Sequence, residues 1–147
     1  MSPESRLTAG ILLILMPAVV YGGTSILSLL VGDPAYADNQ LRQDLWRAGH
    51  AHAGVLLVLS LVTLRYVDEA KLPTSMRTVA RHAVPASAIL LPAAFFLSVL
   101  SPEATEPNAM IYLAYVGAVS LAVGLLILGV GLIRGYQNAG EPRQEGS

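Results

Sequence analysis

The chain has 147 residues, of which 54% are hydrophobic and only 13% are charged. Soluble domains carry about a quarter charged residues, so this composition excludes an ordinary soluble fold and indicates a membrane protein. The formal net charge of -1 gives no basic field that would attract nucleic acid, and the absence of cysteine excludes disulfides and thiolate metal sites.

Four long apolar segments, separated by short polar ones, make up most of the chain. They cover about residues 7–31, 46–67, 79–100 and 108–133, and each is long enough to cross a hydrocarbon core of roughly 30 Å. The Ala35-Tyr36-Ala37 pattern resembles a signal-peptidase site. The apolar segment before it is, however, far longer than the roughly 7–15 residues of a signal h-region, so we expect a retained helix.

Short connections between these segments favour an all-α fold, an integral membrane antiparallel (up-down) four-helix bundle over residues 1–133. The polar segment 38–46 contains no helix breaker, so the second helix is expected to start near Asp38 or Asn39, before the apolar segment. Residues 134–147 are polar and contain glycine and proline, which predicts a disordered cytoplasmic tail.

The distribution of lysine and arginine predicts the orientation. With four crossings, the head, the middle loop and the tail share one side, which holds seven basic residues: Arg6, Arg65, Lys71, Arg77, Arg81, Arg134 and Arg143. The other side holds only Arg42 and Arg47. Basic residues favour the cytoplasmic side, so both termini are expected to be cytoplasmic in a multi-pass protein of the plasma membrane.

Small residues at a spacing of four indicate close helix packing, because they let backbones approach where lipid removes the hydrophobic drive. The fourth segment carries two such stripes, Ala114-Ala118-Ala122 and Ser120-Gly124, and the second segment carries Gly49-Ala53. We expect these stripes to form contacts between the helices, and secondarily a seam between copies of the chain.

Two of the three histidines, His50 and His52, lie together near a predicted membrane boundary, where ionisable groups are costly. At 100° per residue they point about 200° apart, so they cannot share one metal ion within a helix. His50 shares a face with Arg47 and small residues, which favours it as the functional residue. His82, the third histidine, is expected near the opposite membrane face.

Three interpretations of this histidine pair are open. Both side chains can be structural and hydrogen-bonded to a tyrosine, a serine or a backbone carbonyl. Either can contact a haem or a copper or zinc ion, although a haem held by two histidines of one chain conflicts with the depth of His82. Either can handle a proton or a ligand.

A polar cluster near the outer face is a further prediction. By depth, His50 is expected to meet at least one of four residues from the first and fourth segments: Tyr112, Tyr115, Ser25 and Ser28. A polar group at membrane depth needs such a partner. Arg47 is expected to pair with an outer carboxylate or to extend towards the lipid headgroups.

The stretch RAGHAHAGVLLVLSLV, following a first helix with YGG, resembles small uncharacterised four-span bacterial membrane proteins. It also resembles, over one helix, the histidine-bearing helices of haem-copper oxidase subunits. The first resemblance implies no established activity. The second implies that His50 and His52 are the residues to test, without the other histidines that an oxidase site requires.

Two functional hypotheses follow. The favoured one is a small membrane protein, not an enzyme, that contacts the lipid bilayer and acts by helix association, as a homo-oligomer or as an accessory subunit of a larger membrane complex. The alternative is a redox-linked, haem- or metal-binding membrane protein that uses His50 or His52. No phosphate-binding loop, dinucleotide motif or HExxH motif is present in the sequence.

Overall fold

The structure, a computed structural model, describes residues 1–139, and every regular element in that range is a helix. The elements are α1 (Pro3–Gly32), α2 (Pro34–Ala37), α3 (Gln40–Tyr66), α4 (Thr74–Ser98), the 3-10 helix η1 (Ala109–Tyr112) and α5 (Leu113–Ala139). Four of the described helices are long and apolar enough to cross a membrane. The all-α class predicted from the sequence is confirmed.

Short polar residues cap the first three helices. The Ser2 hydroxyl accepts a hydrogen bond from the Ser5 N–H at 3.2 Å, with Pro3 in the first turn of α1. Asp33 ends α1 and caps α2, and the Asn39 side chain caps α3 by accepting from the Arg42 N–H at 3.1 Å. These caps satisfy backbone donors that have no partner within the helix. As predicted, the histidine-bearing helix starts before its apolar segment.

The last helix is longer than the sequence indicated. We expected the span to end at residue 133 and the tail to be disordered from residue 134, but α5 continues to Ala139. That prediction is wrong for residues 134–139, and the rest of the tail lies outside the described residues. A helix does not need lipid to continue, because each backbone N–H bonds the carbonyl four residues earlier.

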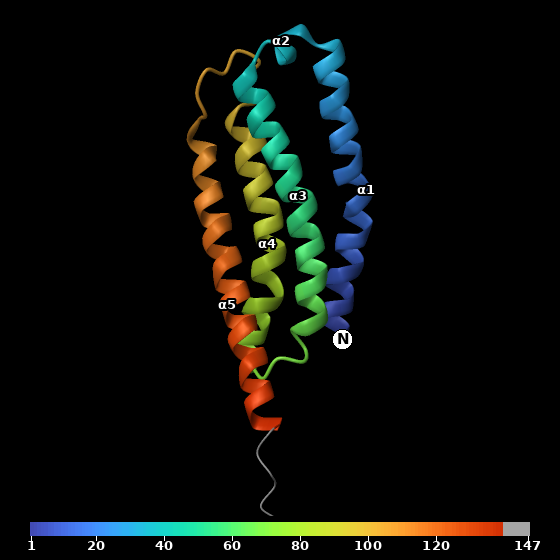
Figure 1. The fold of residues 1–147 in the computed structure, drawn as a ribbon, viewed down its shortest axis with the longest axis vertical. Helices are drawn as coiled ribbons and strands as arrows, with labels where there is room; N and C mark the ends of the chain where they lie inside the picture. The colour runs from blue at the N-terminus through green and yellow to red at the C-terminus, as the bar shows by residue number, and fades with distance from the viewer. Residues whose placement is uncertain (140–147) are drawn as a thin grey trace, which may run out of the picture.

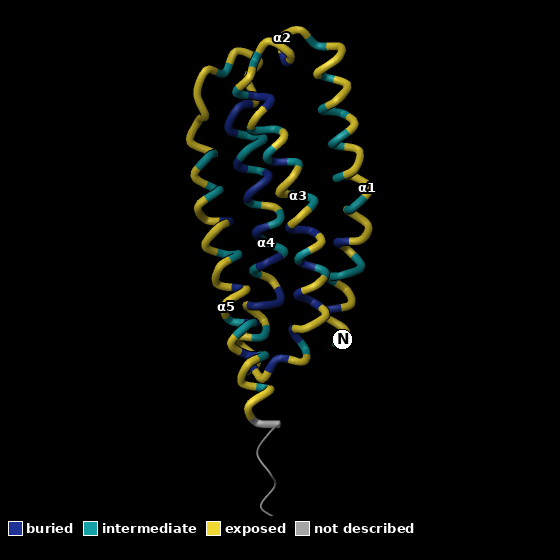
Figure 2. The backbone as a smooth tube through the Cα atoms, in the orientation of Figure 1, coloured by how far each residue is buried: buried dark blue, intermediate teal, exposed yellow. Residues whose placement is uncertain are grey.

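The long helices follow one another across the molecule. α1 packs on α3, α3 packs on α4, and α4 packs on α5, while α1 and α5 lie at opposite sides (Figure 1). Buried residues therefore gather on α3 and α4, and the two outer helices are mostly exposed (Figure 2). In particular, α1 has one main neighbour, α3, and its opposite face is open.

Glycines, rather than the predicted alanines, form the packing face of α5. Gly117 lies against Leu91 and Gly124 against Val84, where an added Cβ would approach the neighbouring side chain to 2.9 Å in each case. The Ser120 hydroxyl donates to the Ala83 carbonyl at 2.8 Å, so the predicted Ser120-Gly124 stripe does face α4.

The prediction for the alanine stripe is wrong for two of its three members, because Ala118 and Ala122 are exposed, whereas Ala114 is half-buried. Spacing alone does not show which of several small-residue stripes faces a neighbour. In the second segment, Gly49 does pack closely, against the ring of Phe96 and the Cβ of Phe95.

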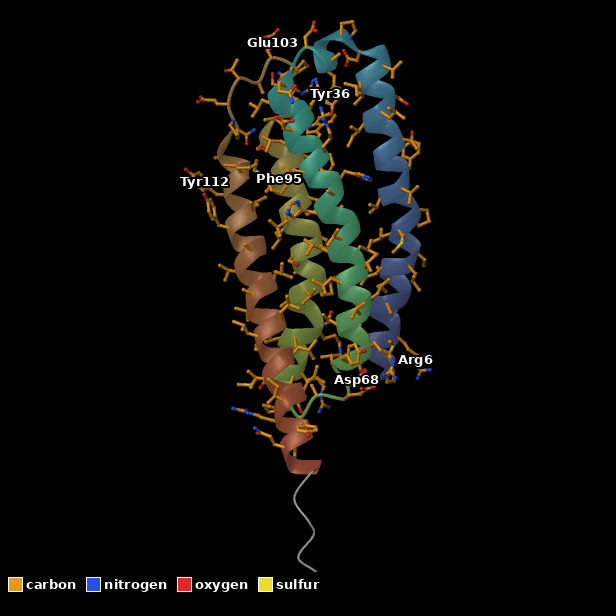
Figure 3. The ribbon with its side chains drawn as sticks, in the orientation of Figure 1. Arg6, Tyr36, Asp68, Phe95, Glu103 and Tyr112 are labelled. Carbon is orange, nitrogen blue, oxygen red and sulfur yellow. The ribbon has the colours of Figure 1, made fainter. Side chains whose placement is uncertain are left out.

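A buried ion pair joins the start of α1 to the α3–α4 connection. Arg81 donates to the Asp68 carboxylate at 3.1 Å, to Ser5 at 3.1 Å and to Ser2 at 3.3 Å. The Ser2 N–H donates to the other Asp68 oxygen at 2.6 Å. Figure 3 shows Asp68 at this end of the molecule, close to the start of α1. We call these four residues the Asp68 cluster.

The surroundings of Asp68 change the pKa of its carboxyl group. Burial alone would raise its pKa, but hydrogen bonds from the Ser2 N–H, the neighbouring hydroxyls and Arg81 outweigh burial and lower the pKa below 3.8, the ordinary value. The carboxylate is therefore ionised at neutral pH and fastens one end of α1.

Candidate functional site

A second buried arginine lies at the other end of the helices, where α2 is located. Arg42 is only 6% exposed, and its Nε donates to the Val99 carbonyl, just beyond α4, at 3.1 Å. Its guanidinium carbon stands 4.7 Å from the centre of the Trp46 ring and 5.7 Å from that of Tyr36. Carbonyls at a helix C-terminus and aromatic faces are both negative, so they hold this cation without a carboxylate.

The two aromatic rings beside Arg42 each carry a buried polar atom without a partner. Tyr36 is 1% exposed and its ring packs 5.4 Å from that of Trp46. Neither the Tyr36 Oη nor the Trp46 Nε1 makes a hydrogen bond within the described part of the chain. Burial raises the pKa of Tyr36, although the charges of Arg47 and Arg42 and the approach of the Arg47 guanidinium to the hydroxyl oppose this, so the phenol is neutral at pH 7.

His50 points from α3 towards α1. A Cβ added at Gly23 would stand 2.7 Å from the His50 Nε2, and one added at Gly22 would stand 3.8 Å from its Nδ1. The imidazole therefore lies against the bare backbone of α1 at Gly23, in space that a side chain at that position would occupy. The described residues provide no hydrogen bond to this ring.

Two cavities between α1 and α3 meet at His50. The first, which we call the head cavity, has a volume of about 300 Å³ and lies at the α2 end. Its lining consists of Gly23, Ile26, Leu27, Leu30, Tyr36, Arg47 and His50. Figure 3 shows Tyr36 between the ends of α1 and α3. The wall formed by α1 is apolar, and the polar groups come from α2 and α3.

The second cavity, which we call the apolar groove, has a volume of about 450 Å³. It follows α1 from Thr8 to Gly22 and reaches Pro85 and Ile89 of α4. It exists because α1 packs on α3 and leaves this part of α4 uncovered. Both volumes lie within the range of about 300–1,000 Å³ typical of small-molecule pockets.

Arg47 lines the head cavity with part of its guanidinium free. Its Nη2 donates to the Gln43 side chain, whose amide donates in turn to the Ala37 carbonyl at 2.7 Å. The predicted carboxylate partner is not found: the ion pairs among residues 1–139 join Arg65 to Glu69 and Arg81 to Asp68.

The predicted polar cluster around His50 does not form. Ser25 and Ser28 donate to carbonyls of their own helix, at 2.9 Å to Tyr21 and at 3.0 Å to Thr24. Tyr112 and Tyr115 pack against each other, with ring centres 6.2 Å apart. Figure 3 shows Tyr112 on the outer side of α5, away from α1. A similar depth along the helices does not bring these side chains to His50, because they lie on helices or helix faces that do not meet it.

His52 lies on a different face from His50. Its Nδ1 is 2.7 Å from the Ala48 carbonyl, and its ring centre is 5.2 Å from that of Phe95 on α4. His52 therefore bonds to its own helix one turn earlier and packs against an aromatic ring, which is the arrangement expected of a structural histidine.

The described residues do not form a three-ligand copper or zinc centre, and His50 and His82 are not placed to hold one haem between them. No three histidine, aspartate or glutamate side chains within residues 1–139 are close enough to hold a metal ion together. His50 and His82 each lie in about the third turn of their helices, counted from opposite ends of the molecule.

Sequence reasoning missed Tyr36 and Arg42 as site residues. Tyr36 was considered only as part of a possible cleavage pattern, and Arg42 only as a charge that sets orientation. The signal that was available is their spacing around Trp46, an aromatic and a basic residue in the polar segment before the second span.

Comparison with protein-family models, with curated proteins and with solved structures finds no match to this chain.

Proposed function

We propose that the protein is an up-down helical membrane protein with both termini in the cytoplasm, which acts by association with a second copy of itself through the outward face of α1. The orientation is supported by the seven-to-two distribution of basic residues in the sequence. The association is supported mainly by one observation, which is the composition of the α1 face opposite α3.

This face carries small residues at a spacing of four: Thr24, Ser28 and Gly32. Together with Tyr21 and Ser25 they line a shallow hollow on the surface of α1. The hydroxyl groups of Thr24, Ser25 and Ser28 are already bonded to carbonyls of α1, so these three add no unsatisfied polar atom to an interface. Such a surface makes poor contact with lipid chains but lets a second helix backbone approach closely.

Cysteine crosslinking in native membranes tests this association, because the chain has no cysteine of its own. In a symmetric dimer the same residue of each copy meets near the two-fold axis. Ser28→Cys is therefore expected to give a disulfide-linked dimer under mild oxidation. Leu27→Cys is the matched control, since it lies at nearly the same depth but is rotated by about 100°, and it is expected to remain monomeric.

Three outcomes would contradict the proposal. Ser28→Cys can remain monomeric, or both variants can crosslink equally, which would indicate random collision. Ser28→Cys can also crosslink to a different protein, which would favour the accessory-subunit hypothesis over the homo-oligomer.

A further inference from the structure

The head cavity and the apolar groove together have the form of a site for one amphipathic molecule. They lie on the inward side of α1 and meet at His50. The argument for this site does not depend on association at the outward face of α1. It depends on the groups that face the head cavity and on the shape of the groove below it.

Three polar groups converge on the head cavity from two elements. The Tyr36 Oη is buried and has no partner in the described chain, although a buried hydroxyl normally has one. Arg47 has guanidinium donors left free after its bond to Gln43, and no carboxylate of the described residues pairs with it. His50 adds an imidazole without a hydrogen bond.

This set of groups is positively charged and rich in donors. A neutral carbonyl, such as that of a quinone, could accept from Tyr36 but would leave Arg47 without a counter-charge. An anionic oxygen pair matches the cavity better, because a guanidinium binds a carboxylate through two parallel hydrogen bonds. The head of the ligand is therefore expected to be a carboxylate.

The apolar groove indicates the rest of the ligand. It follows α1 from Thr8 to Gly22, which corresponds to about 21 Å of helix at 1.5 Å per residue. One leaflet of the hydrocarbon core is only about 15 Å thick, half of the roughly 30 Å core. A groove of this length fits a long unbranched chain.

We propose that the protein binds a long-chain fatty acid, with its carboxylate at Arg47 and Tyr36 and its chain extending past His50 along the apolar groove. Gly23 is then required because a Cβ there would stand 2.7 Å from the His50 Nε2 and push the imidazole out of its place at the junction of the two cavities. The ligand can enter sideways from the membrane, since α1 leaves α4 uncovered along the groove.

Binding of radiolabelled palmitate to the purified full-length protein in detergent tests this proposal. Saturable binding of one palmitate per chain is expected. Hexadecanol, which has the same chain without the carboxylate, is expected to compete roughly tenfold more weakly, because hydrogen bonds to a charged group are worth about a factor of ten or more.

Two variants locate the carboxylate. Arg47→Gln is expected to weaken palmitate binding by roughly tenfold or more, and Tyr36→Phe by roughly threefold to tenfold. Tyr36→Phe keeps the ring that packs on Trp46, so it separates loss of binding from loss of folding. Arg6→Gln and Tyr66→Phe are matched controls at the opposite end of the helices, and both are expected to bind palmitate as the unmodified protein does.

Four results would overturn the proposal. These are the absence of saturable palmitate binding, equal competition by hexadecanol, stronger competition by a single-chain lysophosphatidate than by palmitate, and unchanged palmitate affinity in both Arg47→Gln and Tyr36→Phe. The third result would assign a phosphate rather than a carboxylate to the head cavity.

Discussion

The two ends of the helices each bury an arginine, but they compensate its charge in opposite ways. Arg81 has the Asp68 carboxylate and two serine hydroxyls as partners, so its charge is neutralised and most of its donors are used. Arg42 has backbone carbonyls and two aromatic rings but no carboxylate. The first end is a closed network, whereas the second end holds its buried arginine without a paired carboxylate among the described residues.

The two ends are therefore suited to different roles, one to holding the helices together and the other to binding a ligand. The Asp68 cluster uses its polar atoms on one another and fastens the start of α1. The α2 end leaves the Tyr36 Oη and the Trp46 Nε1 without partners, beside Arg47 and two cavities. The other end also has one such atom, the Arg77 Nε, but that guanidinium donates to the Leu72 carbonyl through its Nη2. Unsatisfied buried groups are costly to a fold, so the end with two of them beside cavities is the better location for a ligand. The predictions below concern this contrast, from the largest expected effect to the smallest.

Replacing Arg81 with methionine is expected to have the largest effect, a loss of about 3 kcal/mol in the free energy of unfolding. The Asp68 carboxylate would remain partly buried without its charged partner, which is the costly way to break such a pair. Equilibrium unfolding in mixed micelles measures the loss.

The control for Arg81→Met is Arg65→Met. Arg65 also pairs with a carboxylate, that of Glu69, but the two side chains are 60% and 49% exposed. Exposed pairs contribute about 0–1 kcal/mol, so a much smaller change is expected. Equal losses in the two variants would show that burial of the Arg81 pair is energetically unimportant.

The end that contains the Asp68 cluster also illustrates what the sequence could and could not predict. Helix number, the approximate spans and the early start of α3 follow from apolar length and from the cap at Asn39, because these are local properties. The pairing of Arg81 with Asp68 and Ser5 depends on which helices are neighbours. Local patterns do not determine which helices are neighbours, so the sequence identifies Arg81 only as a basic residue that sets the orientation.

The same limit explains the errors at the candidate site. His50 was correctly placed apart from His52, because helical rotation is fixed by spacing. Its predicted partners Tyr112 and Ser28 were matched by depth alone. Depth follows from position along a span, whereas the order and rotation of helices depend on packing contacts such as Gly124 against Val84.

Replacing Arg42 with methionine tests the α2 end and is expected to cost less, about 1–2 kcal/mol. The variant loses a hydrogen bond to Val99 and the cation–π contacts, but no uncompensated charge remains in the protein. Trp46 is the only tryptophan, so its fluorescence reports this end specifically. A shift of the Trp46 emission in Arg42→Met, and none in folded Arg81→Met, is expected. The reverse pattern would contradict the assignment of separate ends.

Acidification is expected to weaken the end that contains the Asp68 cluster and not the α2 end. The pKa of Asp68 is lowered on folding, so the stability that it provides is fully present above its unfolded value of 3.8 and is lost as the pH falls through the lower folded value. The effect should be smaller than that of Arg81→Met, because the carboxyl group stays in place. Unfolding measured between about pH 6 and pH 3 should show this loss, and Asp68→Asn should abolish it. An unchanged slope in Asp68→Asn would assign the acid sensitivity to other carboxyl groups.

The smallest expected effect has the opposite sign. In the ligand-free protein, Tyr36→Phe is expected to leave the free energy of unfolding unchanged or to raise it by about 0.5–1 kcal/mol, because it removes a buried hydroxyl that has no partner while the ring keeps its contact with Trp46. Tyr66→Phe, at the closed end, is the matched control and should change little, since Tyr66 is exposed. A loss of more than about 1 kcal/mol in Tyr36→Phe would mean that the hydroxyl is bonded in solution and contributes to the fold. In that case the α2 end would be as fully satisfied as the Asp68 cluster, and the contrast between the two ends would no longer point to a ligand.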